Sequence, residues 1–510
     1  MSDNIRVRFA PSPTGPLHIG GLRTALFNYL FAKSQGGTFI LRVEDTDQNR
    51  FVQGAEDYIK NALAWVGITP DEDPWIGGDF GPYRQSERKG MYAQYAQKLL
   101  DSGNAYYAFD SSEELDTMRE NLKAQNVANQ QYNALTRQSM TNSLTLSEAE
   151  TKERIDSGKP YVIRFKMPQK EEIRFKDTIR GHVRFHSHTL DDKVLLKSDG
   201  MPTYHLANVV DDYLMKITHV IRGEEWLPSA PLHVMLYKTL GWEDSMPQFA
   251  HLPLILKPTG KGKLSKRDGA KHGYSVFPLE WKDPETGEIS TGFREDGYLP
   301  EALINFLALL GWNPGDEREI FSMEELVKTF SMERVNNSGA KFDVDKSKWY
   351  NQHYLKAKSP EELGEMLLEE LKKDKVDCTL EKATQIAELM RERITFSNEL
   401  YENAKYFFHA PTEYDAKVAK KKWTQEAVNI FEQYISEIES ASDFSAENAK
   451  AILEKVLEKN EVGLGRVMQA LRLATTGEGG GPDLMPTLSI LGKEEVAKRI
   501  RTAIEKLEAK

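Results

Sequence analysis

Residues 5–21 read Ile5-Arg-Val-Arg-Phe-Ala-Pro-Ser-Pro-Thr-Gly-Pro-Leu-His-Ile-Gly-Gly21, and this stretch decides the fold. Its first residues alternate apolar and polar side chains, as a strand does, and the prolines end the strand. A helical pattern follows over 22–33, and a second strand (38–43) leads through Glu44-Asp-Thr-Asp47 into another helix. This β-α-β-α rhythm predicts an α/β fold with a doubly wound, Rossmann-like parallel sheet.

The loops after these two strands carry the polar residues. In parallel sheets, ligands bind at the carboxyl ends of the strands. The loops 11–21 and 44–47 both lie there, so we expect them to converge on one crevice. Segment 194–222 resumes the alternation of strand and helix, whereas 111–190 mixes charged helical runs with strands and is predicted to be an α+β insertion.

The last third of the chain is predicted to be helical. Ser359-Pro-Glu-Glu362 is a strong helix start, with Ser as N-cap, Pro at the first helical position and Glu able to bond back. The 3.6-residue pattern then recurs over 361–373, 426–438, 448–459 and 494–507.

The composition describes a packed, acidic protein. The chain has 510 residues, which suits three or four domains. Its net charge of -11 excludes a diffuse polycation, so any polyanion must bind a local patch. The single cysteine, Cys378, excludes an internal disulfide and indicates a reducing compartment. The N-terminus lacks a signal pattern and the longest apolar stretch, 302–312, is too short to span a bilayer, which predicts a cytoplasmic protein without a membrane partner.

The loop before the first helix is one candidate site. A helix N-terminus attracts phosphate through its unsatisfied N–H groups and partial positive charge. Gly20 and Gly21 would let a phosphate or adenine approach the backbone, and His18, about one turn before the helix, could donate to a phosphoryl oxygen. Taken alone, an ordinary Gly-rich turn with a surface histidine explains this loop more often than a site does.

A basic cluster over 257–271 is the second candidate site. So many cations in an acidic protein favour an anionic ligand, and the flanking glycines allow closure over it. A solvated basic loop explains the composition equally well. Neither candidate is a Walker P-loop, because G-x-x-x-x-G-K-[ST] is absent. The cluster sets one acid, Asp268, against Lys257, Lys261, Lys263, Lys266, Arg267 and Lys271.

The two candidates together resemble a known pair of motifs. Ala10-Pro-Ser-Pro-Thr-Gly-Pro-Leu-His-Ile-Gly20 and Lys263-Leu-Ser-Lys-Arg267 resemble the HIGH and KMSKS signatures of class I aminoacyl-tRNA synthetases, although Gly21 stands where the first signature has its second His. The fuller resemblance is to bacterial-type glutamyl-tRNA synthetases. It rests on blocks in the family's order: 8–15, 41–47, 81–88, 195–200, 202–212 and 221–226.

The resemblance implies a two-step reaction. Glutamate and ATP would form glutamyl-adenylate with Mg²⁺ bridging phosphate oxygens, and the terminal adenosine of tRNA(Glu) would then take the glutamyl group. It also implies a monomer and a need for bound tRNA in activation. The implied domains are a Rossmann-like catalytic region (1–110 and 191–250), a connective, acceptor-binding insertion (111–190), a KMSKS-loop and stem-contact domain (251–350), and an all-helical anticodon-binding region (351–510) with two subdomains that meet near 415.

The charges of glutamate predict the type of pocket it needs. Two carboxylates require cations and the ammonium requires an anion. Arg8 and Arg222, at predicted strand ends, would bind carboxylates in a bidentate manner, and Glu44 would bind the ammonium. A surface pair of Arg222 with Glu224 or Glu225 is the structural alternative. The resemblance completes the glutamate site with Phe9, Ala10, Ser12, Tyr204, His205, Leu206, Ala207 and Asn208.

The resemblance also assigns the nucleotide site. His18, Lys263 and Lys266 are the predicted catalytic residues, since donors and cations that face the phosphates would stabilise the developing charge. No covalent enzyme nucleophile is needed. The predicted ATP-binding residues are His18, Gly20, Gly21, Glu225, Leu254, Ile255, Lys263, Leu264, Ser265, Lys266 and Arg267.

Specificity is predicted to depend on arginines. Glutamine would leave Arg222 poorly compensated, because a neutral amide replaces the carboxylate, so Arg222 is the predicted discriminating residue. Arg391 and Arg393 are predicted to read the anticodon, since an arginine fork can recognise a base edge, and Arg50 is a further predicted tRNA contact. Two exposed helix arginines are the structural alternative for Arg391 and Arg393.

Departures from the family pattern separate the alternatives. Tyr106-Tyr-Ala-Phe-Asp110 stands where some relatives place Cys-x-Cys, so we predict no zinc and no protein-held metal site. A glutaminyl-tRNA synthetase would have a β-rich tail, and a tRNA-modifying enzyme would lack the helical third. An inactive RNA-binding paralogue would not need His18, Lys263, Lys266, Arg8 and Glu44 together. The sequence leaves open whether tRNA(Gln) is charged as well as tRNA(Glu).

Overall fold

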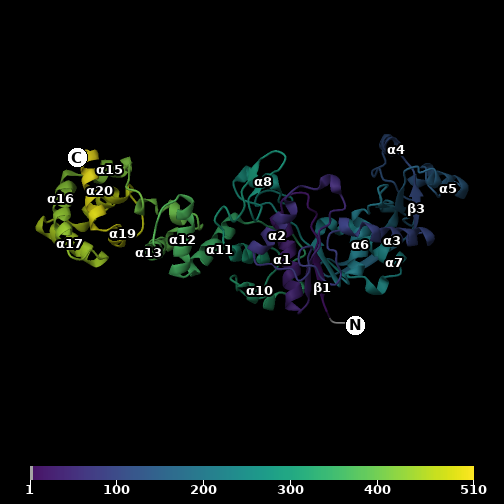
Figure 1. Ribbon diagram of the computed structural model, residues 1–510, viewed down its shortest axis with the longest axis horizontal. Coiled ribbons are helices and arrows are strands. Elements are labelled where there is room, and N and C mark those ends of the chain that lie inside the picture. Colours follow the sequence, from purple (N-terminus) through teal and green to yellow (C-terminus); the bar gives the residue numbers. More distant parts are fainter. Residues whose placement is uncertain (1–3, 510) are drawn as a thin grey trace. The chain divides into compact units, whose positions relative to one another are not determined.

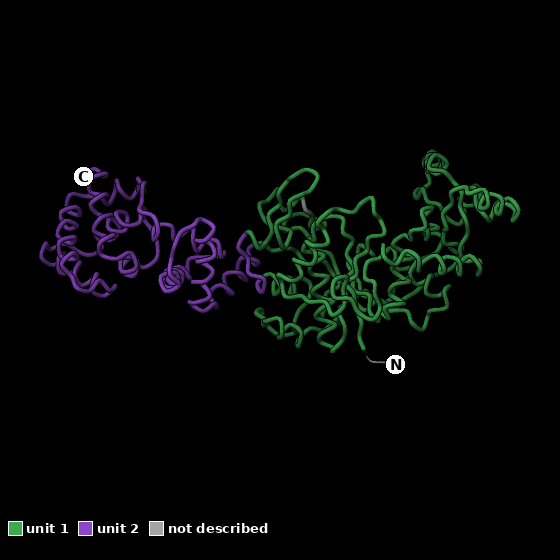
Figure 2. The backbone as a smooth tube through the Cα atoms, viewed as in Figure 1, with its two compact units in different colours: residues 1–295, 303–344 green, residues 296–302, 345–510 purple. Residues whose placement is uncertain are grey.

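The computed structural model describes residues 4–509, apart from the side chains of Lys266 and Ala270. It divides into two compact units, coloured separately in Figure 2: Met1–Glu295 with Leu303–Val344, and Asp296–Ala302 with Asp345–Lys510. Among the described helices, none has the length and apolar character needed to cross a membrane.

A six-stranded sheet forms the centre of the first unit (Figure 1). Its order is β2-β1-β8-β9-β5-β6, and every neighbouring pair is parallel except β5 with β6. The predicted α/β class is confirmed, with a mixed sheet because the β5–β6 hairpin adds an antiparallel edge. The strands are β1 (Arg6–Phe9), β2 (Thr38–Leu41), β5 (Glu172–Asp177), β6 (Gly181–His186), β8 (His219–Gly223) and β9 (Gln248–Leu252).

Helices connect and cover these strands. The predicted strand–loop–helix unit is confirmed, and α1 packs against β1, β2 and β8 through buried Leu22, Leu26 and Leu30. The helix begins at Ile19, earlier than the apolar pattern indicates, because His18 caps its first turn. The helices around the sheet are α1 (Ile19–Ser34), α2 (Ala55–Trp65), α3 (Lys89–Asp101), α6 (Tyr204–Leu214) and α7 (Ala230–Thr239).

The segment 111–190, predicted to be an insertion, is partly integrated into the central sheet. Its hairpin, β5–β6, belongs to the central sheet, whereas the strand expected to resume the doubly wound pattern, β7, pairs in a separate antiparallel sheet of order β3-β4-β7. Single-sequence patterns identify strands but not their partners, which explains the difference. The elements of this region are β3 (Ala105–Ala108), α4 (Ser112–Ala124), α5 (Glu148–Asp156), β4 (Val162–Phe165) and β7 (Val194–Leu196).

Shorter elements complete the first unit. The pair β10–β13 is parallel and the pair β11–β12 is antiparallel. The helix α9 (Pro300–Leu309) includes residues of both units. These elements are β10 (Ile255–Leu256), α8 (Lys266–His272), β11 (Trp281–Lys282), β12 (Ile289–Ser290), α10 (Met323–Thr329) and β13 (Ala340–Lys341).

The second unit is helical over its described residues. Ser359 caps the N-terminus of a helix through a capping box with Glu362, as predicted, and the four predicted helical segments are confirmed. Its helices are α11 (Val344–Ala357), α12 (Pro360–Lys373), α13 (Leu380–Met390), α14 (Glu399–Glu402), α15 (Ala416–Lys422), α16 (Gln425–Ser440), α17 (Ala446–Lys459), α18 (Leu464–Thr476), α19 (Leu484–Leu491) and α20 (Lys493–Lys506).

Short 3-10 helices occur in both units. They are η1 (Gln48–Arg50), η2 (Ser86–Arg88), η3 (Thr136–Ser139), η4 (Ser187–Thr189), η5 (Glu224–Ser229), η6 (Glu243–Ser245), η7 (Met332–Arg334), η8 (Arg391–Arg393) and η9 (Lys405–Phe407).

Candidate active site

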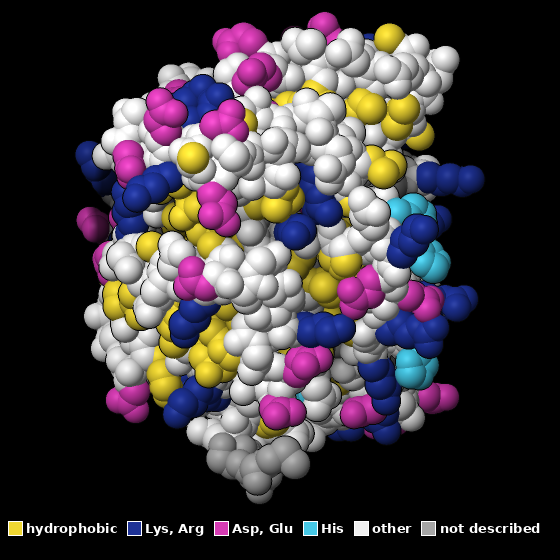
Figure 3. Space-filling view, turned by 90° about the vertical axis from the view of Figure 1, so that its right-hand side faces the viewer, with side chains coloured by type: hydrophobic (Ala, Val, Ile, Leu, Met, Phe, Trp, Pro, Cys, Tyr) yellow, Lys and Arg dark blue, Asp and Glu magenta, His cyan; other side chains and the backbone are white. Residues whose placement is uncertain are grey.

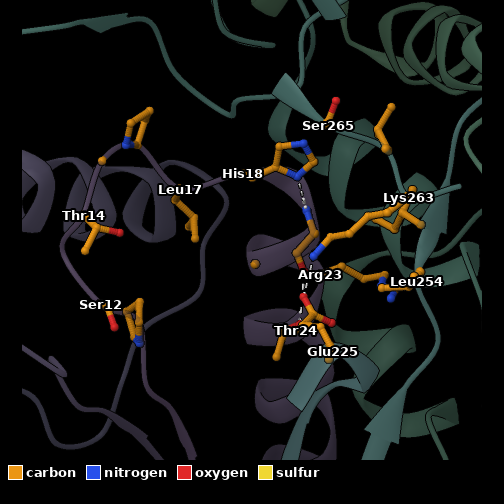
Figure 4. A pocket seen from close by; sticks show the side chains of 18 of the residues that line it. Ser12, Thr14, Leu17, His18, Arg23, Thr24, Glu225, Leu254, Lys263 and Ser265 are labelled. Atoms are coloured by element: carbon orange, nitrogen blue, oxygen red, sulfur yellow. Dashed lines mark hydrogen bonds and ion pairs between the residues drawn. The ribbon is translucent and has the colours of Figure 1, made fainter. Parts of the chain in front are cut away.

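Two adjoining cavities open at the carboxyl ends of β1 and β8, where the sequence predicts a crevice. The lysine-side cavity, of about 500 Å³, includes His18, Leu254 and Lys263 in its wall (Figure 4). The arginine-side cavity, of about 370 Å³, includes Arg222 and Glu44. Both cavities are lined by Pro11, Ser12, Thr14, Leu17, Gly20, Gly21, Thr24, Gly223 and Glu225.

His18 joins the loop to the helix. Its Nδ1 accepts the N–H of Gly20 at 3.0 Å, which makes it the N-cap of α1 rather than a residue one turn before the helix. A neutral ring in this position carries its proton on Nε2. A Cβ on Gly21 would lie 2.6 Å from the side chain of Leu17, so the close approach of loop and helix favours glycine there.

The basic loop contributes an exposed ion pair to the lysine-side cavity. Lys263 Nζ lies 2.6 Å from Glu225 Oε1, and the two side chains are 52% and 42% exposed (Figure 4). Lys257 pairs with Asp268, whose carboxylate also closes a capping box with Ser265 at the start of α8. Exposed pairs are weak, so an anionic ligand can compete with Glu225 for Lys263.

Arg222, at the end of β8, is buried beside the arginine-side cavity. Its Nε donates to His251 Nε2 at 3.0 Å, and its Nη1 donates to Tyr204 Oη at 2.7 Å. Nη1 also lies 3.5 Å from Nδ1 of His233, whose pKa burial and the charge of Arg222 hold well below the ordinary value. The other terminal nitrogen, Nη2, is buried without a hydrogen-bond partner among the described residues. Such a group fits a carboxylate ligand.

Arg8 and Glu44 line the arginine-side cavity and belong to a network of buried ion pairs that also includes Arg42 and Asp212, which do not line it. Arg8 binds Asp212 through Nε and Nη2, at 2.9 and 3.2 Å. Arg42, which is fully buried, donates to Asp212 and to Glu44, both at 2.8 Å. Asn208 donates to the same Glu44 oxygen at 2.9 Å. The side chains that would meet an amino acid are therefore fixed before any ligand binds.

Burial favours a higher pKa for both carboxylates of this network, but the neighbouring arginines offset it to different extents. Burial raises the pKa of Glu44 above its ordinary value, and Arg42 and Arg8 offset only part of the effect. At Asp212, the same two guanidiniums outweigh burial and hold the pKa below the ordinary value. Asp212 is the firmly ionised partner of the arginines, whereas the charge of Glu44 is the more sensitive to pH.

Comparison with known proteins agrees with this geometry. Residues 4–349 match the family of class I tRNA synthetases (E and Q), catalytic domain, and residues 361–504 match an anticodon binding domain. A glutamate–tRNA ligase of Cytophaga hutchinsonii is 59% identical over 514 residues, which cover 100% of this chain and 99% of the relative. The chain belongs to the glutamate–tRNA ligase family.

Further relatives within the glutamate–tRNA ligase family support this assignment. A glutamate–tRNA ligase of Amoebophilus asiaticus is 56% identical over 99% of this chain and 98% of its own length. The crystal structure of a glutamate tRNA ligase from Elizabethkingia meningosepticum, in complex with its amino acid, superimposes with a TM-score of 0.95 at 51% identity, covering 99% of this chain and 100% of that one. The predicted family, fold class and enzyme class are confirmed.

The structure brings together eight of the eleven residues predicted for glutamate, and the rest lie elsewhere. Tyr204 and Asn208 share one face of α6, so the residues between them turn away. His205 lies against His233, whereas Leu206 and Ala207 are buried in the hydrophobic core. The eight lining residues are Arg8, Phe9, Ala10, Ser12, Glu44, Tyr204, Asn208 and Arg222.

Two predicted contacts of the glutamate–tRNA ligase pocket need correction. Arg8 uses Nε and Nη2 to bind Asp212, so this pair of donors is not available for a bidentate contact with a ligand. The surface alternative for Arg222 is wrong, because Glu224 binds Arg180 and Glu225 binds Lys263.

Most of the residues that are predicted to bind ATP lie in the wall of the lysine-side cavity. Arg267 does not line it, because it lies in the first turn of α8 with its side chain exposed. The side chain of Lys266, a predicted catalytic residue, lies outside the described part of the structure. The lining residues are His18, Gly20, Gly21, Glu225, Leu254, Ile255, Lys263, Leu264 and Ser265.

The three arginines predicted for tRNA differ in their surroundings. Arg50 is exposed and lines the arginine-side cavity. Arg391 donates to the backbone carbonyls of Lys356 and Lys358, each at 2.7 Å, so much of its fork has a structural role. The side chain of Arg393 is exposed and forms no hydrogen bond or ion pair with other described residues, so it is better placed than Arg391 for a base contact.

The position predicted to lack zinc ligands is filled by an aromatic residue with its own polar partners. Tyr106 is buried on β3 and donates to Asp192 at 2.7 Å, and Arg137 binds the same carboxylate. In the part of the chain that the structure describes, no group of three or more His, Cys, Asp or Glu side chains is arranged to hold a metal ion.

Sequence reasoning missed four residues of the site. Arg42 and Asp212 lie inside motif blocks, but only the fold shows that they pair. His251, on β9, and Asp177, on β5, stand behind Arg222. Asp177 leaves one signal, since it follows Ile173 and Phe175 at alternate, inward positions where an apolar residue is expected.

Proposed function

We propose that this chain activates L-glutamate with ATP and transfers the glutamyl group to the terminal adenosine of tRNA(Glu). The observation that carries the proposal is the pair of Arg222 and Glu44, a buried cation and a buried anion that both line the arginine-side cavity. Glutamate presents a side-chain carboxylate to the first and an ammonium to the second. The adjoining lysine-side cavity would then hold ATP next to the α-carboxylate.

Glutamate binding would use charges that the protein has already desolvated. Nη2 of Arg222 would take the side-chain carboxylate together with Tyr204, and Glu44 would take the ammonium. Arg42 and Asn208 hold Glu44 in place through its Oε1. Because these groups are fixed before binding, little ordering is required of them when the ligand arrives.

Activation would be an in-line displacement at phosphorus. A carboxylate oxygen of glutamate attacks the α-phosphorus, the bond to the β-phosphate breaks, and pyrophosphate leaves. His18 Nε2–H and Lys263 are placed to meet phosphate oxygens, which makes catalysis a matter of positioning and charge neutralisation. The phosphates would carry Mg²⁺, and Glu225 is the carboxylate in the described wall of this cavity able to hold that ion.

Transfer would follow on the same site. The 2'-hydroxyl of the terminal adenosine attacks the carbonyl carbon of glutamyl-adenylate, loses its proton, and displaces AMP. Arg50, at the mouth of the arginine-side cavity, would contact the incoming tRNA end, while Arg393 would contact the anticodon. We place this reaction in the cytoplasm with a monomeric enzyme, and we expect activation to require bound tRNA.

The test is glutamate-dependent ATP–pyrophosphate exchange with and without purified tRNA(Glu) and tRNA(Gln), followed by charging of each tRNA on acid gels. We expect exchange only with tRNA(Glu) present. Charging of both tRNAs would establish the non-discriminating alternative, and an absence of exchange with either tRNA would refute the proposal.

A further inference from the structure

A line of buried hydrogen bonds runs across three strands behind the arginine-side cavity. Asp177 Oδ2 lies 2.6 Å from His251 Nδ1, and His251 Nε2 accepts from Arg222 Nε at 3.0 Å. Asp177 and His251 are fully buried and Arg222 is 5% exposed. The strand register places Arg222 of β8 directly beside His251 of β9, so the contact is built into the sheet.

The hydrogen-bond pattern fixes the form of His251. Asp177 accepts the backbone N–H groups of Ile179 and Arg180 at 3.0 and 2.8 Å, as an ionised carboxylate does. His251 therefore donates from Nδ1, and its Nε2 presents a lone pair to the N–H of Arg222. Burial lowers the pKa of His251, which keeps the ring neutral near neutral pH.

The direct partners of Arg222 are neutral. Its guanidinium is surrounded by His251, Tyr204 and His233. The carboxylate of Asp177 is hydrogen-bonded to the far side of the His251 ring and does not contact Arg222. Arg42, by contrast, touches carboxylates directly. Among the described residues, Arg222 is thus oriented by neutral side chains, with no carboxylate in direct contact.

We propose that His251, held by Asp177, is a positioning residue that aims the Arg222 guanidinium at the side-chain carboxylate of the amino acid and so sets the preference for glutamate over glutamine. This inference rests on the proposed function. With Nε held by His251 and Nη1 by Tyr204, the plane of the fork is fixed, and Nη2 is the nitrogen that remains for the ligand. A neutral amide ligand would leave that charge without an anion in contact.

The test compares His251→Phe, which keeps a planar ring stacked on Phe249, with His251→Gln, which keeps an acceptor. In pyrophosphate exchange with tRNA(Glu), we expect His251→Phe to raise KM for glutamate by about 10- to 100-fold, as for loss of a hydrogen bond to a charged group. The preference for glutamate over glutamine should fall by a similar factor, whereas KM for ATP stays the same. His251→Gln should restore most of both quantities.

Two further variants separate positioning from general damage. Asp177→Asn keeps the side-chain volume at position 177 but allows His251 to donate from its other ring nitrogen. It should therefore lower the preference for glutamate over glutamine, by a smaller factor than His251→Phe does. His219→Phe, at the opposite end of β8 and packed on Phe31, should leave both quantities unchanged. Circular dichroism confirms folding of each variant.

The outcomes distinguish the two proposals. If the unmodified chain shows no glutamate-dependent exchange, the proposed function fails and the positioning role fails with it. If the unmodified chain is active and a folded His251→Phe or Asp177→Asn keeps the full preference for glutamate, only the positioning role is overturned. Should His251→Phe not fold, Asp177→Asn decides.

Discussion

The arginine-side and lysine-side cavities share a wall but hold their charges in opposite ways. Arg8, Arg42, Glu44 and Asp212 are buried and paired with each other. Lys263, on the other side, is about half exposed and paired with an exposed Glu225. Charges in a buried network interact strongly and cannot exchange partners cheaply, whereas an exposed lysine can. Under the proposed function, the buried half would recognise the amino acid, and the exposed half would take up and release phosphates.

The largest effect is expected from breaking the buried network. Asp212→Asn leaves Arg8 and Arg42 without their shared anion and should lower the free energy of unfolding by about 3–5 kcal/mol. Urea unfolding followed by circular dichroism measures this. As a matched control, Glu171→Gln breaks the exposed pair with Lys238 and should cost less than about 1 kcal/mol. Equal costs would remove the contrast between buried and exposed ion pairs.

Removal of the recognising cation should affect glutamate alone. Arg222→Gln removes the charge that meets the side-chain carboxylate, and we expect kcat/KM for glutamate to fall by roughly two to three orders of magnitude, from loss of a buried charge contact. Steady-state charging with saturating ATP measures it. Arg222→Lys should recover little, because an ammonium cannot make the same fork of hydrogen bonds. A variant with normal glutamate kinetics would show that the carboxylate binds elsewhere.

Removal of the exposed lysine should affect the nucleotide step instead. Lys263→Ala should lower the exchange rate by about 10- to 100-fold, through loss of a charged contact to phosphate. KM for glutamate and the free energy of unfolding should not change. Lys261→Ala, on the same loop but outside the cavity wall, is the control and should behave as the unmodified chain does. Matching losses in both variants would indicate a general effect of loop charge.

The smallest effect is expected from pH. Burial raises the pKa of Glu44, so on acidification its carboxylate is lost at a higher pH than an ordinary glutamate. Because the ammonium needs that carboxylate, KM for glutamate should rise by about two- to five-fold as pH falls from about 8 to about 6. Glu44→Gln should have a higher KM that no longer varies with pH over this range. A rise of the same size in Glu44→Gln would assign the titration to another group.

The sequence predicted the local parts of this structure better than the contacts between them. The strand–loop–helix unit, the two converging loops and the helices of the second unit follow from periodicity and capping, which are local properties. The pairing of Arg8 with Asp212 joins residues 204 positions apart, and His251 meets Asp177 across 74 positions. Such pairs depend on strand order, and the sequence assigned β5 to a separate insertion.

The hairpin β5–β6 also determines how the sheet ends. Its exposed residues place Arg174 opposite Arg184 and Lys176 opposite His182, and Glu172 forms ion pairs with both arginines. The face drawn in Figure 3 carries Lys and Arg side chains together with Asp and Glu. Like charges in register weaken a hairpin slightly. On β6, which is the edge strand, a charged residue such as Arg184 disfavours pairing with a second copy of the strand. The hairpin that positions Asp177 thus also gives the sheet an edge with charged side chains, of the kind that disfavours edge-to-edge pairing.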